Sequence, residues 1–211
     1  MIRNLAFGSA VLSVLILAVL TVAAGLAYPD YDHMSQFISE LGATGTATGP
    51  AVSLGFIVSG GLLTLFWLLC IGLFPRSPLA TAGFILSALN GLGLMFGGVF
   101  PCAFECSLVD ATPSAVLHDV LGGIGYLAGI AGICLIALAA RGWPRDRFLY
   151  PLGLACGIPA AGAIWLLHPG FEWYGAAQRV LEIALAIFAL AVAFTARRSE
   201  PQAAKRPPRA A

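Results

Sequence analysis

Residues 5–42 set the pattern for the whole chain, with LAFGSAVLSVLILAVLTVAAGLA at positions 5–27 followed by the polar stretch YPDYDHMSQFISELG at positions 28–42. The first of these runs contains no charged side chain. About 20 apolar residues suffice for a helix to cross the hydrocarbon core of a bilayer, which is roughly 30 Å thick. The run is also longer than the roughly 7–15 apolar residues of a signal peptide. We therefore expect an uncleaved membrane-spanning helix here.

Five further runs of similar length predict five more spanning helices. The expected fold is all-α, a polytopic six-transmembrane-helix bundle with helices at about 5–27, 50–74, 79–100, 114–140, 148–167 and 171–196. Only 10% of the residues are charged and 59% are hydrophobic, whereas soluble domains carry about 25% charged residues. This composition excludes a large soluble domain. Residues 197–211 are basic and rich in Pro and Ala, so we expect a disordered cytoplasmic tail.

The basic residues predict how the bundle is oriented. Ten of the eleven Lys and Arg residues lie before the first run, after the last run, or in the second and fourth loops. Because Lys and Arg accumulate in cytoplasmic loops, we expect both termini to be cytoplasmic. The charges are sorted by side of the membrane and form no single patch, so the expected partner is the lipid bilayer and not nucleic acid. The exception is Arg179, in the outer half of the last helix.

The polar stretch 28–42 holds three acids and a histidine but no Lys or Arg. We expect it to form a short helical or re-entrant segment, with Asp32 as its N-cap and Gly42 just past its C-terminal end. Most other acids, and all three histidines, also belong to the expected outer side. This gathering predicts a polar pocket that opens outward. Its expected wall is Asp32, His33, Ser35, Glu40, His118, Asp119, His168, Glu172, Arg179 and Glu182.

Arg179 and Glu182 are three residues apart and share a face of the last helix. A charge at the middle of a spanning helix costs about 2.5–3.5 kcal/mol on insertion scales. We therefore expect Arg179 to face inward and to pair with Glu182, Asp119 or Glu40. The arginine then either locks the helices together or binds an anionic group of a substrate. Asn90, in the third run, is expected to form an interhelical hydrogen bond.

Three histidines and a carboxylate have the composition of a zinc site with an open position. His33, His118 and His168 are the candidate ligands, and each would come from a different element because the chain has no H-E-x-x-H or H-x-x-x-H pair. In this interpretation the protein is a zinc-dependent hydrolase acting on lipid, with Glu40 or Asp119 activating a water molecule. In the other interpretation each histidine makes a hydrogen bond to a carboxylate or to the backbone.

Two pairs of small residues allow alternative interpretations. Cys102 and Cys106 share an expected outer loop, where an oxidised pair is the default. A disulfide is the first interpretation, and free thiols or metal ligands are the others. The pattern Gly125-x-x-x-Gly129 permits close helix approach, either within the bundle or between subunits of a homo-oligomer.

Four stretches carry a resemblance to a known family. They are Ser39-Glu40-Leu41-Gly42, Val99-Phe100-Pro101-Cys102, His118 at the start of the fourth helix, and Gly175-Ala176-Ala177-Gln178-Arg179. With them the chain resembles, over roughly residues 5–196, the prokaryotic integral-membrane family named domain of unknown function 998. The resemblance implies a compact six-helix bundle in a prokaryotic cell membrane, with recurring polar residues on its outer side. It implies no known activity.

The function that these patterns favour is an outward-facing pocket that binds a small polar molecule or a lipid head group. The expected substrate-binding residues are His33, Ser35, Glu40, His118, Asp119, Arg179 and Glu182. The zinc hydrolase is one alternative. The other is a structural or assembly protein whose polar cluster serves only to specify packing.

Overall fold

The computed structural model describes residues 1–107, 109 and 112–198. Its helices are α1 (Ile2–Ala27), η1 (Ile38–Gly42), α2 (Gly49–Cys70), α3 (Pro78–Val99), η2 (Phe104–Cys106), α4 (Pro113–Ala140), α5 (Leu149–Ala163), η3 (Ile164–Leu166) and α6 (Tyr174–Arg198). In this part of the chain there is no strand, and six helices are long and apolar enough to cross a membrane. The predicted all-α, six-helix bundle is confirmed. The predicted disordered tail lies almost wholly outside the described residues.

The expected helix boundaries differ from the observed ones by a few residues. The differences are largest at the ends of α2 and α5, which lie four residues before the expected ends, at Cys70 and Ala163. α2 ends at Cys70 because the next four residues form a turn. In this turn Leu73 N and Phe74 N both donate to Cys70 O, at 3.0 and 3.2 Å. At the other end of the chain, α6 begins at Tyr174. Pro159 lies inside α5 without ending it.

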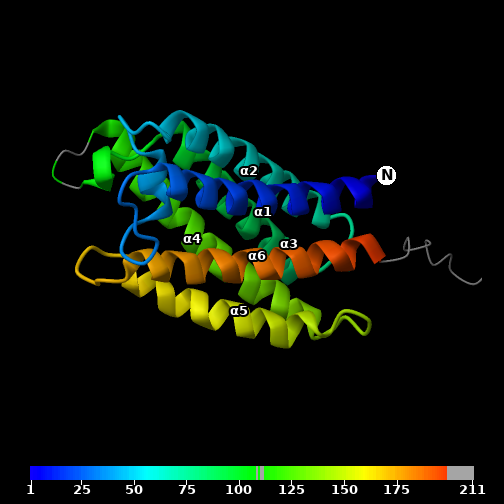
Figure 1. Cartoon of the computed structure of the whole chain (residues 1–211). Helices are drawn as coiled ribbons and strands as arrows, with labels where there is room; N and C mark the ends of the chain where they lie inside the picture. The colour runs from blue at the N-terminus through cyan, green and yellow to red at the C-terminus, as the bar shows by residue number, and fades with distance from the viewer. Residues whose placement is uncertain (108, 110–111, 199–211) are drawn as a thin grey trace, which may run out of the picture.

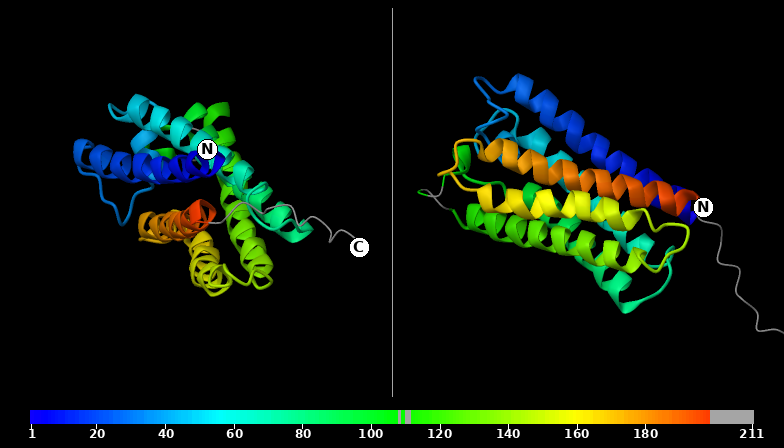
Figure 2. Two further views of the ribbon diagram at one scale, coloured as in Figure 1. Left: turned by 90° about the vertical axis from the view of Figure 1, so that its right-hand side faces the viewer. Right: turned by 90° about the horizontal axis from the view of Figure 1, so that it is seen from below.

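Each helix packs against the next along the chain, and α6 returns to pack against α1 (Figures 1 and 2). The N-terminus and the end of α6 lie at the same end of the bundle (Figure 1). We call this the proximal end. The opposite, distal end carries η1, η2 and the loop between α5 and α6. The proximal half is filled by a large apolar core that includes Phe66, Phe84, Ile136, Leu149 and Phe188.

Glycines let α2, α3 and α4 approach closely. A Cβ on Gly60 would collide with the backbone of Met95 on α3. Gly93 of α3 faces Gly125 of α4. A Cβ added to Gly125 would lie 3.0 Å from the Gly93 Cα. Gly129 packs against the Asn90 side chain. The Gly125-x-x-x-Gly129 pattern therefore serves packing within the bundle, and a homo-oligomer stays a prediction.

Candidate functional site

Residues 28–42 fold back over the distal end of the bundle and attach to the first turns of α6. We call residues 28–42 together with residues 174–179 the clasp. A Cβ at Gly175 would collide with the Gln36 backbone, so only glycine allows this close approach. Ala176 N donates to Met34 O at 2.9 Å. These backbone contacts hold the loop against α6.

Arg179 is the polar centre of the clasp. Its Nη1 donates to Gln36 O at 3.0 Å and to Gly175 O at 2.9 Å. Its Nη2 donates to Tyr31 Oη at 2.7 Å and to His33 Nδ1 at 2.9 Å. The guanidinium also lies 5.7 Å from the centre of the Tyr31 ring. Four acceptors from two elements therefore surround a single cation.

None of these acceptors is a carboxylate, so the expected pairing of Arg179 with Glu182, Asp119 or Glu40 is wrong. The physical reason is the position of the loop. It places two backbone carbonyls, a phenol and an imidazole around the guanidinium, which satisfy it without an anion. Arg179 is thus a bridge between α6 and the loop.

Glu40 is a buried member of the clasp, only 3% exposed. Its Oε1 accepts from Phe37 N at 2.8 Å and its Oε2 from Gln36 Nε2 at 2.9 Å. Tyr174 Oη also donates to Oε1, at 3.4 Å. Burial raises the pKa of the Glu40 carboxyl above its usual range, although these hydrogen bonds oppose the shift. The hydrogen bonds indicate that Glu40 shapes the start of η1.

The predicted role of Asp32 as an N-cap is wrong. Its carboxylate closes a turn by accepting from Met34 N at 2.9 Å and from Ser35 Oγ at 2.7 Å. These hydrogen bonds lower the pKa of the Asp32 carboxyl. The helical segment begins later, at Ile38, with Phe37 as its N-cap. Ser35 is therefore committed to this turn.

The three histidines do not gather. His33 accepts from Arg179, and His118 Nδ1 lies 2.8 Å from the O atom of Phe100, which directly follows α3. His168 Nδ1 accepts at 3.1 Å from the backbone N–H two residues later. Among the described residues, no group of three or more His, Cys, Asp or Glu side chains is placed to hold a metal ion. The structure does not support the predicted zinc site, because each ring contacts a different partner, namely Arg179, Phe100 O or Gly170 N.

The loop after α3 is tied to the loop after η1. Cys102 and Cys106 form a disulfide with an S–S distance of 2.09 Å. Thr44 N donates to Cys102 O at 3.0 Å, and Ser39 Oγ lies 3.4 Å from Cys106 Sγ. These contacts join η1 and η2 over the distal end of the bundle.

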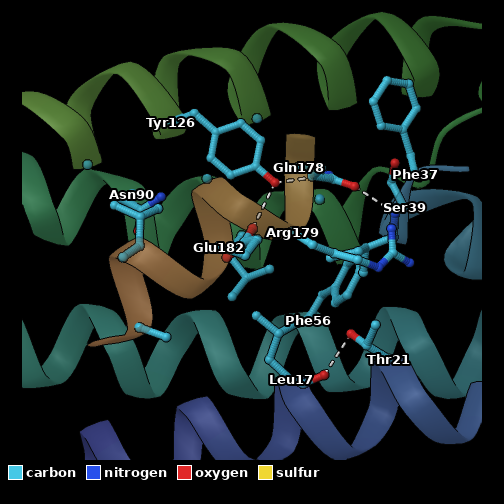
Figure 3. A pocket seen from close by; sticks show the side chains of 18 of the residues that line it. Leu17, Thr21, Phe37, Ser39, Phe56, Asn90, Tyr126, Gln178, Arg179 and Glu182 are labelled. Carbon is cyan, nitrogen blue, oxygen red and sulfur yellow. Dashed lines mark hydrogen bonds between the residues drawn. The ribbon is translucent and has the colours of Figure 1, made fainter. Parts of the chain in front are cut away.

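Beneath these loops lies a cavity of about 760 Å³ (Figure 3). Its wall is mostly apolar and comes from α1, η1, α2, α3, α4, α6 and the loop before α6. Asp119 and Pro169 line its distal part, and Ser13 and Leu63 line its deeper part. Ser13 and Leu63 each lie 14 residues from the distal end of their helix, which corresponds to about 21 Å at 1.5 Å per residue. The cavity therefore extends beyond the middle of the bundle.

A chain of hydrogen bonds leads from the clasp into this cavity. Ile38 N donates to Gln178 Oε1 at 2.6 Å, and Gln178 Nε2 donates to Tyr126 Oη at 3.0 Å. Tyr126 Oη in turn donates to Glu182 Oε1 at 2.7 Å (Figure 3). Tyr126 is not among the predicted site residues, since a lone tyrosine within an apolar run carries no spacing signal. The Gln-Arg dipeptide at 178–179 was the available signal for Gln178.

Two buried polar side chains in the cavity wall lack a partner among the described residues. Ser87 is 2% exposed and its hydroxyl has no hydrogen bond. Asn90 is 8% exposed, and its side chain also makes none. The expected interhelical hydrogen bond of Asn90 is therefore absent within the described part of the chain. Both residues line the cavity from α3.

The predicted pocket wall is thus divided between two places. The cavity is lined by His33, His118, Asp119, Arg179 and Glu182. The cavity wall does not include the other predicted residues, Asp32, Ser35, Glu40, His168 and Glu172.

One known family matches most of the chain. The family model described as "Protein of unknown function (DUF998)" matches residues 11–195. The matched range includes both halves of the clasp and the whole of the cavity wall. No curated protein and no solved structure shows a significant match. The match spans most of the 211 residues, and the chain therefore belongs to the DUF998 family of proteins of unknown function.

Proposed function

We propose that this protein binds an amphipathic lipid in the cavity, with an apolar chain in the deep part and a polar head group at the distal end. The single observation that carries the proposal is the cavity itself, about 760 Å³ in volume and mostly apolar. Binding sites for small molecules are typically about 300–1,000 Å³, apolar, and furnished with a few polar groups. This cavity has that size and composition.

Its length favours a chain-like ligand. The wall extends about 21 Å from the distal end, by the helical rise, to Ser13 and Leu63. A compact polar molecule would leave most of that apolar wall uncovered. An acyl or similar chain would cover it, since apolar contact stabilises roughly in proportion to the area removed from water.

The polar groups in the wall suit a ligand that also makes hydrogen bonds. A buried polar group without a partner costs about 1–3 kcal/mol, so the Ser87 hydroxyl favours a ligand with a hydroxyl, ester or amide group at its depth. Asn90 lines the cavity on the same helix. Nearer the distal end, His118 and Asp119 are positioned to meet the head group.

The distribution of charge supports an outward-facing site. Within the described residues, the basic residues other than Arg179 occur at the proximal end, at the start of α1, in the α2–α3 and α4–α5 loops and at the end of α6. By the positive-inside rule, both termini are cytoplasmic and the cavity opens toward the outer face of a prokaryotic cell membrane.

A photoactivatable phosphatidylcholine, with a diazirine near the end of one acyl chain, tests the proposal. The purified protein is reconstituted with this lipid and irradiated, and the labelled residues are mapped by peptide mass spectrometry. We expect labels on Trp67 and Ile133, which line the deep part of the cavity and are buried. Labels confined to the outer, lipid-facing side chains would overturn the proposal.

Two glycines supply a matched pair of variants. A Cβ on Gly122 or Gly123 meets nothing within 4 Å, and both residues line the cavity. Phenylalanine at both positions should narrow the cavity and lower the deep labelling at least fivefold. Gly61 has the same free space but does not line the cavity, so Gly61→Phe should label like the wild type.

A further inference from the structure

The cavity reaches the side of the bundle between α1 and α6. Val22 of α1 and Ile183 of α6 both line it, and they are 56% and 58% exposed. Each also belongs to a stripe of exposed apolar residues on its helix, which includes Val19 on α1 and Ile187 on α6. A residue that belongs both to the outer stripe and to the cavity wall marks the edge of an opening.

The remaining edges of this opening are small or apolar, apart from one carboxylate. Val14 and Ala18 continue the α1 edge at helical spacing, and Ala186 continues the α6 edge. Glu182 lies beside Ile183 and lines the cavity. We call the opening between these six residues the α1–α6 window.

The window is closed at the proximal end. There the Phe7 and Phe194 rings meet edge to face, with their centroids 5.0 Å apart. The Arg197 guanidinium lies 4.5 Å from the centre of the Phe7 ring. Figure 2 shows α1 and α6 meeting near the N-terminus and diverging toward the distal end.

The clasp closes the window at the distal end. A Cβ on Gly25 would lie 2.7 Å from His33 Cε1, so the His33 ring packs directly on α1. The same ring accepts a hydrogen bond from Arg179 of α6. His33 therefore bridges the distal ends of the two helices and leaves the opening between them in the membrane-facing middle.

We propose that the ligand is a lipid of the bilayer itself, which passes sideways through the α1–α6 window from the leaflet nearest the distal end. This inference rests on the function proposed above and adds the source of the ligand. A lipid chain leaving the bilayer crosses edges that are apolar apart from Glu182, whose carboxyl accepts a hydrogen bond from Tyr126, and the exposed stripes on either side of the window carry no charge. The head group stays at the distal end, where His118 and Asp119 line the cavity.

The rate of lipid exchange tests the window separately from binding. Protein loaded in detergent with the photoactivatable phosphatidylcholine is reconstituted into vesicles of unlabelled phosphatidylcholine. Samples are irradiated after increasing delays, and the label remaining on Trp67 and Ile133 is measured. The double variant Val22→Trp/Ile183→Trp, which narrows the window, should lose its deep label at least tenfold more slowly than the wild type.

The control places the same bulk on the same helices. Val19→Trp/Ile187→Trp changes exposed residues that do not line the cavity and should exchange at the wild-type rate. Equal exchange in all three proteins, with deep labelling intact, would overturn the window and leave lipid binding standing. Absence of deep labelling in the wild type would overturn both. Each variant must show a single thermal unfolding transition and a monodisperse elution profile. If a double variant fails, its two single-site variants are measured in its place.

Discussion

Replacing Arg179 by methionine removes the charged centre of the clasp while keeping a long apolar side chain. Three of the four hydrogen bonds of Arg179 cross from α6 to residues 31–36. A hydrogen bond to a charged group contributes about 1.5–3 kcal/mol, but removing the guanidinium also removes the cost of burying it. The net loss in the free energy of unfolding should be about 2–4 kcal/mol.

Two measurements check this expectation. Unfolding in mixed detergent micelles, with increasing fractions of sodium dodecyl sulfate, measures the loss of stability. Hydrogen exchange measures whether the backbone amides of residues 28–37 lose protection, as they should when the loop is released from α6.

Two further variants sharpen the test. Arg179→Lys keeps the charge but lacks the planar fork that reaches several acceptors at once, so its loss should be intermediate. Arg147 is exposed and lies in the α4–α5 loop, and Arg147→Met should change stability by less than about 0.5 kcal/mol. If Arg179→Met loses less than about 1 kcal/mol and the loop stays protected, the clasp does not hold the distal end.

The same unfolding and exchange measurements test the helix packing and the protonation of His33. Gly60→Ala should lower the free energy of unfolding by about 1–3 kcal/mol, because its Cβ would meet the Met95 backbone. The control Gly61→Ala has open space around its Cβ and should change the free energy of unfolding by less than about 0.5 kcal/mol. The pKa of His33 is lowered below its ordinary value of 6.5, first by burial and then by the Arg179 charge. The stability that neutral His33 contributes is therefore complete above pH 6.5 and is lost as the pH falls through the lowered pKa. The protection factors of the amides in residues 28–37, which correct for the pH dependence of intrinsic exchange, should be lower at pH 5 than at pH 7.5. The difference should shrink in His33→Gln, and an undiminished difference in the variant would assign the effect to another group.

The number and type of the helices could be predicted from the sequence. In a bilayer, every backbone N–H and C=O group must find a partner within the chain. Long runs of apolar residues therefore have few options other than spanning helices. The same runs are apolar on all sides, and so they do not show which face of a helix looks inward.

The membership of the site could be predicted only in part. His118, Asp119, Arg179 and Glu182 do line the cavity, because an ionisable group in a spanning helix tends to turn away from lipid. His33 also lines it, from the loop between α1 and η1. Their partners could not be predicted, since each depends on residues distant in the sequence. Tyr126 and Glu182 are 56 positions apart and form one of the shortest side-chain contacts.

The sequence alone determined a six-helix membrane protein with an unusual arginine near one end of its last helix. Only the tertiary structure decided that this arginine meets neutral acceptors from residues 31–36, about 145 positions earlier in the chain, and no carboxylate. The same holds for the cavity, whose wall combines residues of α1, α2, α3, α4 and α6 that are far apart in the sequence. Apolar composition predicts spanning helices, because the bilayer offers the backbone no hydrogen-bond partners. The distances between the helices depend on packing between residues far apart in the sequence, which no local pattern encodes.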